Sequence, residues 1–315
     1  MRHNLISFLA ALFVCGLSLT SCQKTDEDLN NIALELCQYI PDHQLREQSR
    51  DYMTSDFYAV LDTMFNLPEH EAMDHEWLYY FVTGNGGTIP DFSVDTVQLR
   101  DETHALALLT VRQMWEDSTY TDEDDFEEHR LYMEKVGGKW LISDFDELKQ
   151  DCIEGIAKWR KEEALRQAIS TYLVKEVGPH YLQGELCIPL IMLLTTEEDS
   201  QTEARVYGDF WVFNYNLAGD TLKTVSGGNH PGCMTVAKVG DKLQVTAFEQ
   251  TADGSGYQAS AKRIFGKHYD SFQLMHSCDD VREAVRAEQL RQYIQQNDLP
   301  VKYYQDYGWD AVELL

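Results

Sequence analysis

Apolar side chains recur along this chain with two different periods, and each period predicts one kind of element. A spacing of three or four residues from Asp26 to about Ile40, within residues 42–66 and from Leu148 to about Val177 predicts helices. Pro41 ends the first of these patterns and Gly178-Pro179 ends the third. Another helical pattern runs from about Asp279 to Gln296 and precedes an aromatic tail.

Between these helices, apolar and aromatic residues alternate with polar ones and are punctuated by glycine turns, which predicts antiparallel strands. The first group of expected strands is Trp77–Thr83, Val94–Leu99, His104–Trp115, Arg130–Val136 and Lys139–Phe145. The second group is Leu186–Thr196, Ala204–Leu217, Thr221–Ser226, Cys233–Val239 and Lys242–Gln250. Each half of the chain therefore has helices followed by strands, and we expect the α+β class.

The repeated plan predicts two small domains, each with helices packed on a curved antiparallel sheet. The polar run Lys158–Glu163 lies between two helical stretches, and we place the domain boundary there. We expect a signal peptide over residues 1–21 and an acidic tether with a short helix over 22–41. An N-terminal α+β domain over 42–160 and a C-terminal α+β domain over 161–315 follow.

The N-terminus has the layout of an export signal. Met1–Asn4 is short and basic, and Leu5–Leu19 is an apolar run too short to span a bilayer comfortably but right for a signal-peptide core. Leu19-Thr20-Ser21-Cys22 follows, and it resembles the lipobox of bacterial lipoproteins. The resemblance implies cleavage before Cys22 and a diacylglyceryl group on its thiol. The alternative is an ordinary secretory leader with a chance cysteine.

A lipid on Cys22 would make the membrane a partner of the protein through the anchor. We therefore expect a cell-envelope protein, specifically an outer-membrane lipoprotein. Gln23–Asp28 resembles, loosely, the acidic signal for surface display in Bacteroidetes lipoproteins, but a solvated tether explains the same residues. Both a periplasm-facing and a surface-facing position stay open.

Charge and cysteine content narrow the function classes further. The net charge of −27 repels phosphate backbones, so we expect no nucleic-acid partner. The 7 cysteines show no zinc-ligand spacing. Asp122–Glu128 lacks the glycine and the spacing of a calcium loop, and His70-Glu71 with His75-Glu76 lacks the spacing of a zinc helix. We expect neither a metal nor a cofactor.

Two longer stretches carry a family resemblance. Residues 42–147 resemble a lipoprotein domain of the nuclear transport factor 2-like, or cystatin-like, superfamily. The residues behind this likeness are Arg50–Tyr58, Tyr79–Gly87 and Gly138–Phe145. Residues 205–310 are similar to a C-terminal segment of uncharacterised Bacteroidetes lipoproteins, through Tyr207–Tyr215, Ser226–Gly232 and Tyr304–Trp309. The resemblance implies a sheet curved around a helix with a concave pocket, and it leaves the chemistry open.

Two sets of residues are candidates for a binding site. The first is an expected loop in which paired glycines free the backbone to approach a ligand and a histidine can donate or accept a proton. It consists of Ser226, Gly227, Gly228, Asn229 and His230. The second set comprises the candidate pocket aromatics Trp77, Tyr79, Tyr80, Trp211 and Tyr215. Turn geometry and ordinary sheet packing are the competing explanations of these two sets.

From the sequence we expect a membrane-anchored, non-catalytic binding module, because pocket-forming sheets occur without an identifiable catalytic set. Its partner would be a small ligand, a peptide, a glycan or an envelope protein. One alternative is an envelope hydrolase that uses His230. Another is an inhibitor or immunity-type protein whose acidic face meets a basic partner, which the net charge motivates.

Overall fold

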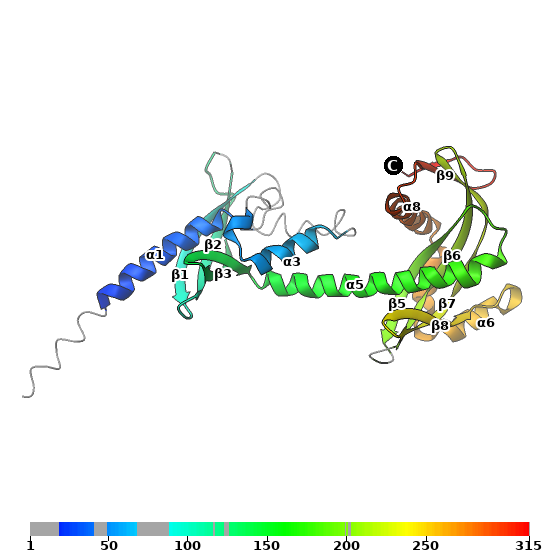
Figure 1. The fold of residues 1–315 in the computed structure, drawn as a ribbon, viewed down its shortest axis with the longest axis horizontal. Helices are drawn as coiled ribbons and strands as arrows, with labels where there is room; N and C mark the ends of the chain where they lie inside the picture. Colours follow the sequence, from blue (N-terminus) through cyan, green and yellow to red (C-terminus); the bar gives the residue numbers. More distant parts are fainter. Residues whose placement is uncertain are drawn as a thin grey trace, which may run out of the picture. The chain divides into compact units, whose positions relative to one another are not determined.

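A computed structural model describes residues 19–40, 49–67, 88–115, 117–122, 126–198, 200 and 203–314 (Figure 1). The chain divides into two compact units, the first ending at Lys158 and the second beginning at Trp159. The boundary falls inside the long helix α5 (Leu148–Tyr172). The leader core, the expected strand Trp77–Thr83 and the aromatics within it lie outside the described residues. No helix in the described ranges is both long and apolar enough to cross a membrane.

The first unit holds a four-stranded antiparallel sheet in the order β1-β2-β3-β4. Its elements before α5 are α1 (Leu19–Cys37), the 3-10 turn η2 (Arg50–Tyr52), α3 (Ser55–Phe65), β1 (Ile89–Leu99), β2 (His104–Met114), β3 (Glu127–Val136) and β4 (Lys139–Phe145). Gly137 and Gly138 have φ of +60° and +87°, which suits the tight turn between β3 and β4. The expected hairpin across these glycines is confirmed.

The second unit holds a sheet in the order β10-β9-β7-β6-β5, with β8 also paired to β7. Its strands are β5 (Leu186–Glu198), β6 (Glu203–Ala218), β7 (Thr221–Val239), β8 (Lys242–Gln250), β9 (Tyr303–Gln305) and β10 (Val312–Glu313). Its helices and turns after α5 are η4 (Leu173–Val177), η5 (Gly178–His180), η6 (Gly254–Gly256), α6 (Tyr257–Phe265), η7 (Gly266–His268), α7 (Tyr269–Ser277) and α8 (Asp279–Gln296). All pairings are antiparallel except β7 with β9.

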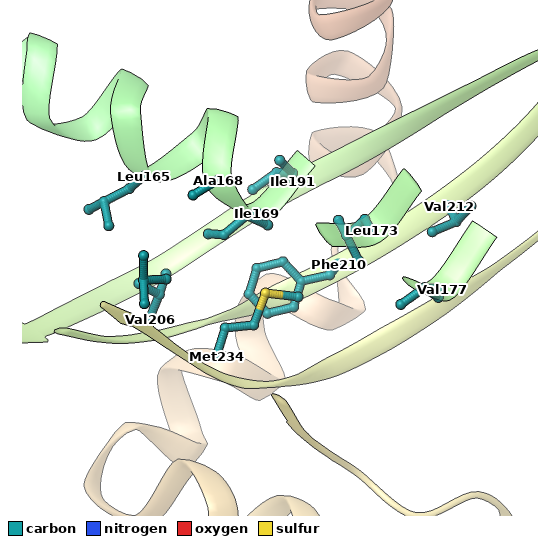
Figure 2. Close-up of a cluster of buried hydrophobic side chains, with 11 residues drawn as sticks. Leu165, Ala168, Ile169, Leu173, Val177, Ile191, Val206, Phe210, Val212 and Met234 are labelled. Carbon is teal, nitrogen blue, oxygen red and sulfur yellow. The ribbon is translucent and has the colours of Figure 1, made fainter. Parts of the chain in front are cut away.

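One face of this sheet is covered by the end of α5 and the π-helical turn η4 that continues it. Leu165, Ile169 and Leu173 point from the helix onto Val206 and Phe210 of β6, and Figure 2 shows these side chains interlocked. The four-residue spacing of Leu165, Ile169 and Leu173 places them on one stripe. Burial of this stripe fixes α5 over the sheet and so positions the groove described below.

The other face is covered by α6, α7 and α8. Phe265 of α6 and Phe272 of α7 stack with ring centroids 3.8 Å apart, and α8 packs through Leu290 and Ile294. The helix expected at about Asp279–Gln296 is confirmed as α8. The sequence pattern predicts no element over residues 257–277, where α6 and α7 lie. These two helices are nine residues each, too short for a clear helical period.

The expected loop from Ser226 to Gly232 is wrong, because these residues lie inside β7, a single strand of 19 residues. Gly227 pairs with Phe213 and Gly228 with Val212 of β6. A Cβ on Gly227 would lie 2.6 Å from the Val212 carbonyl oxygen, and one on Gly228 would lie 2.1 Å from the Tyr181 hydroxyl. The glycines therefore allow close packing within a curved sheet and do not form a turn.

Candidate functional site

A groove of about 760 Å³ lies in the second unit between α5 with its continuation η4 and the start of β8. Its helical wall is lined by Ala164, Gln167, Ala168, Thr171, Tyr172, Lys175 and Glu176. Its strand wall is lined by Asp241, Lys242, Leu243, Gln244 and Val245. The groove is within the size range of protein ligand sites.

The groove exists because small side chains occupy one flank of the helix. Ala164, Ala168 and Thr171 follow each other at four and three residues, so they share a flank and leave space beside β8. Leu243 and Val245 pack on the core under α5 and give the groove an apolar floor. The floor is thus apolar and the rim is polar, the combination that ligand sites commonly show.

Charges of both signs stand on the rim. Lys175 and Glu176 lie at the end of the helical wall, and Asp241 and Lys242 lie at the start of the strand wall. No ion pair within the described chain involves any of these four side chains. They are available to pair with charges on a ligand.

His230 does not point into this groove and is not arranged as a catalytic base. Its Nε2 lies 2.9 Å from the Tyr181 hydroxyl, and its Nδ1 lies 2.8 Å from Gln250 Oε1. An amide oxygen only accepts, so Nδ1 donates to Gln250 and Nε2 accepts from the Tyr181 hydroxyl. Both ring nitrogens are engaged by neutral groups, which supports a structural role within the sheet.

The other residues of the expected loop have local roles. The Ser226 hydroxyl donates to the Leu182 carbonyl oxygen at 2.6 Å and accepts from the Asn214 amide at 3.3 Å. Asn229 is exposed and pairs in register with Trp211. The structure therefore brings Asn229 beside one candidate aromatic, but it places this set away from the groove.

The candidate aromatics Trp211 and Tyr215 lie on β6 under α8. Trp211 is half-buried and stacks on Phe213, with the Arg282 guanidinium 5.1 Å from its ring centroid. Tyr215 is wholly buried, and its hydroxyl accepts two hydrogen bonds from Arg286 at 3.0 and 3.1 Å. Burial raises the pKa of Tyr215 to about 12. Tyr215 is therefore a core residue and does not line the groove.

Sequence reasoning missed a buried acid–imidazole pair. Asp209 of β6 is 1% exposed, and its Oδ2 accepts from Nδ1 of His276 on α7 at 2.7 Å. The second carboxylate oxygen, Oδ1, has no hydrogen-bond partner in the described residues. The two residues lie 67 positions apart on elements that only the tertiary fold brings together, so no local spacing could indicate them.

The structure says less about the lipidation site, the N-terminal aromatics and the cysteines that the sequence singled out. The backbone of Cys22 belongs to α1, but its side chain is outside the described part of the structure. Trp77, Tyr79 and Tyr80 lie wholly outside the described residues. The five cysteines from Cys37 onward are free. Burial raises the pKa of Cys37 and Cys152 to about 12, which makes these thiols poor nucleophiles.

No protein-family model matches the chain, and no curated protein matches it. A solved structure described as an Ntf2 like protein involved in plasmid conjugation is similar over 74% of this chain and 98% of that chain. The two share 11% sequence identity with a TM-score of 0.22. A TM-score of this size carries no functional argument. The chain's own elements show a mixed α+β fold of helices and curved antiparallel sheets.

Proposed function

We propose that this protein is a lipid-anchored binding module of the cell envelope, and that its ligand site is the groove between α5 and β8. The observation that carries the proposal is the groove itself, with its apolar floor of Leu243 and Val245 and its charged rim. A site of this kind binds by covering an apolar surface and selecting polar groups at the edge.

The same proposal includes a lipid anchor on Cys22 and membership of the nuclear transport factor 2-like lipoproteins. The apolar run before Leu19-Thr20-Ser21-Cys22 supports export and lipidation, and the helices on curved sheets agree with a nuclear transport factor 2-like lipoprotein. The partner is an outer-membrane or periplasmic molecule that the groove can contact.

The geometry gives less support to the two alternatives. A hydrolase that used His230 would hold its ring against a carboxylate in a cleft, whereas the ring nitrogens of His230 contact the neutral groups of Tyr181 and Gln250 and His230 does not line the groove. An inhibitor with an acidic binding face would need a surface other than the groove. The groove rim has two lysines, Lys175 and Lys242, and two acidic residues, Glu176 and Asp241.

Photocrosslinking in living cells tests the groove. A benzoylphenylalanine placed at Thr171 lies in the groove. The same group at Val174 is the control, because Val174 is exposed on the same helical segment but does not line the groove. We expect adducts from position 171 that are absent at position 174, identified by mass spectrometry. Equal adducts at both positions, or none at position 171, would refute a groove-binding function.

A further inference from the structure

The groove runs along the free edge of a strand. A strand that presents one face to a cavity contributes every second residue, because successive side chains alternate between faces. Four consecutive residues of β8, Lys242 to Val245, line this groove, so it follows the side of β8 and not only its face. Within the described residues β8 pairs with β7 alone, and its other edge has no strand.

The opposite edge of the same sheet is covered. On β5, the Ile191 amide donates to Gln289 Oε1 of α8 at 2.9 Å, and Gln289 Nε2 donates to the Ile191 carbonyl oxygen at 2.9 Å. This side-chain amide satisfies the edge as a neighbouring strand would. The fold thus caps the β5 edge at Ile191, whereas no described strand pairs with the β8 edge beside the groove, and open edges are templates for strand addition.

We propose that the ligand of this groove is an extended polypeptide segment that adds to β8 as a further strand, an inference that rests on the proposed binding function. The helical wall of Ala164, Ala168 and Thr171 is small enough to admit a chain beside β8. Main-chain hydrogen bonds to β8 supply affinity, and alternate side chains reach the apolar floor, as in other helix–strand peptide grooves.

The charges specify the occupant further. Lys175, Glu176, Asp241 and Lys242 on the rim match a segment that carries both acidic and basic side chains on its outward positions. The net charge of −27 on the whole chain attracts a partner protein of opposite sign over longer distances. The partner is therefore an envelope protein of net positive charge that presents an extended, alternately apolar segment.

The test uses random decapeptides displayed on phage, selected on the full-length protein at low salt and counter-selected on Thr171→Trp. The tryptophan fills the groove from an exposed position, while Val174→Trp adds the same bulk outside it. Circular dichroism confirms that both variants fold. We expect selected peptides to bind wild type and Val174→Trp alike and to lose at least about tenfold affinity for Thr171→Trp.

The strand geometry is tested on the selected peptide, synthesised with N-methyl groups on every odd or every even residue. An added strand turns alternate amides toward β8, so one N-methylated form should lose about tenfold or more in affinity and the other should change little. Equal losses in both forms, or equal retention, would overturn strand addition.

Two further results separate this inference from the proposed function. If no peptide is selected but position 171 still gives specific crosslinks, the groove binds a ligand that is not an extended peptide. If analytical ultracentrifugation finds a dimer that Thr171→Trp dissociates and Val174→Trp does not, a second copy of the chain fills the groove. Either outcome would overturn the peptide inference.

Discussion

Glycines in the second unit determine how closely its strands approach. A Cβ on Gly208 would lie 2.5 Å from the Met192 carbonyl oxygen, and one on Gly232 would lie 2.3 Å from the Glu249 carbonyl oxygen. These neighbours are backbone atoms that cannot move aside, so a side chain at either position would push the strands apart. Gly227 and Gly228, which indicated a loop in the sequence, also meet close neighbours and likewise serve the sheet.

Gly228 tests the same close packing against a side chain, that of Tyr181. In Gly228→Ala the new methyl group would meet the Tyr181 hydroxyl and separate it from His230. We expect a loss of about 1–3 kcal/mol in the free energy of unfolding, the usual cost of overpacking. Urea unfolding measures this loss. Asn229→Ala, one residue along and exposed, should change stability by less than about 0.5 kcal/mol. Equal effects in both variants would contradict the packing argument.

His129 gives the first unit a pH-dependent contribution. Burial opposes the charge on this imidazole, but hydrogen bonds and attraction from Asp146, 2.6 Å away, and from Glu127 outweigh it and raise the pKa of His129. Because the folded pKa exceeds the unfolded value of about 6.5, the stabilisation is complete below that pH and disappears as pH rises through the folded pKa.

We therefore expect wild type to lose stability relative to His129→Gln as the pH rises from about 6.5 through the raised pKa of His129. Urea unfolding at several pH values, followed by hydrogen exchange of β3, reports the difference. A constant gap between the two proteins across this range would show that the imidazole charge does not contribute.

At the scale of elements, the sequence predicted the strands β4 and β8, which follow glycine turns of hairpins. It did not predict that β7 is one continuous strand, because pairing with β6 decides this. Lys139–Phe145 and Lys242–Gln250 have the bounds expected from their alternation and their glycine turns. In contrast, β7 joins two expected strands through Ser226–Gly232, a stretch with the composition of a loop. Continuous pairing with β6 keeps this stretch extended, and no local signal records that pairing.

The C-terminal strands depend on one arginine of α8. Arg286 is 2% exposed, forms a bidentate ion pair with Asp306 at 2.8 Å, and donates to Tyr215 of β6 and to Thr224 of β7. Asp306 directly follows β9, so this ion pair holds the tail on the sheet. Hydrogen bonding and attraction from Arg286 lower the pKa of the Asp306 carboxyl.

Arg286→Leu should cost about 2–4 kcal/mol, somewhat less than a fully buried pair because Asp306 is partly exposed. Arg282→Leu is the matched control, since Arg282 lies one turn earlier on α8 and makes surface contacts worth about 1 kcal/mol or less. Hydrogen exchange in β9 should rise in Arg286→Leu only. Unchanged exchange there would show that other contacts hold the tail.

At the scale of the whole molecule, the membrane attachment that we propose depends on residue 22. In Cys22→Ala the thiol that would carry the acyl chains is gone, so we expect the protein to take up no radiolabelled palmitate and to move from the membrane to the soluble fraction. Ser21→Ala keeps a small residue before the cysteine and should still be labelled. Retained labelling and sedimentation in Cys22→Ala would reject the lipid anchor.

The sequence by itself determined the mixed α+β class and most helix and strand positions. These depend on local periodicity, turn chemistry and short motifs, which one segment contains entirely. Only the tertiary structure decided that Ser226–His230 is a strand, that Asp209 meets His276, and that α5 leaves a groove beside the open edge of β8. Each of these depends on contacts between distant segments, and a linear pattern does not encode distance in space.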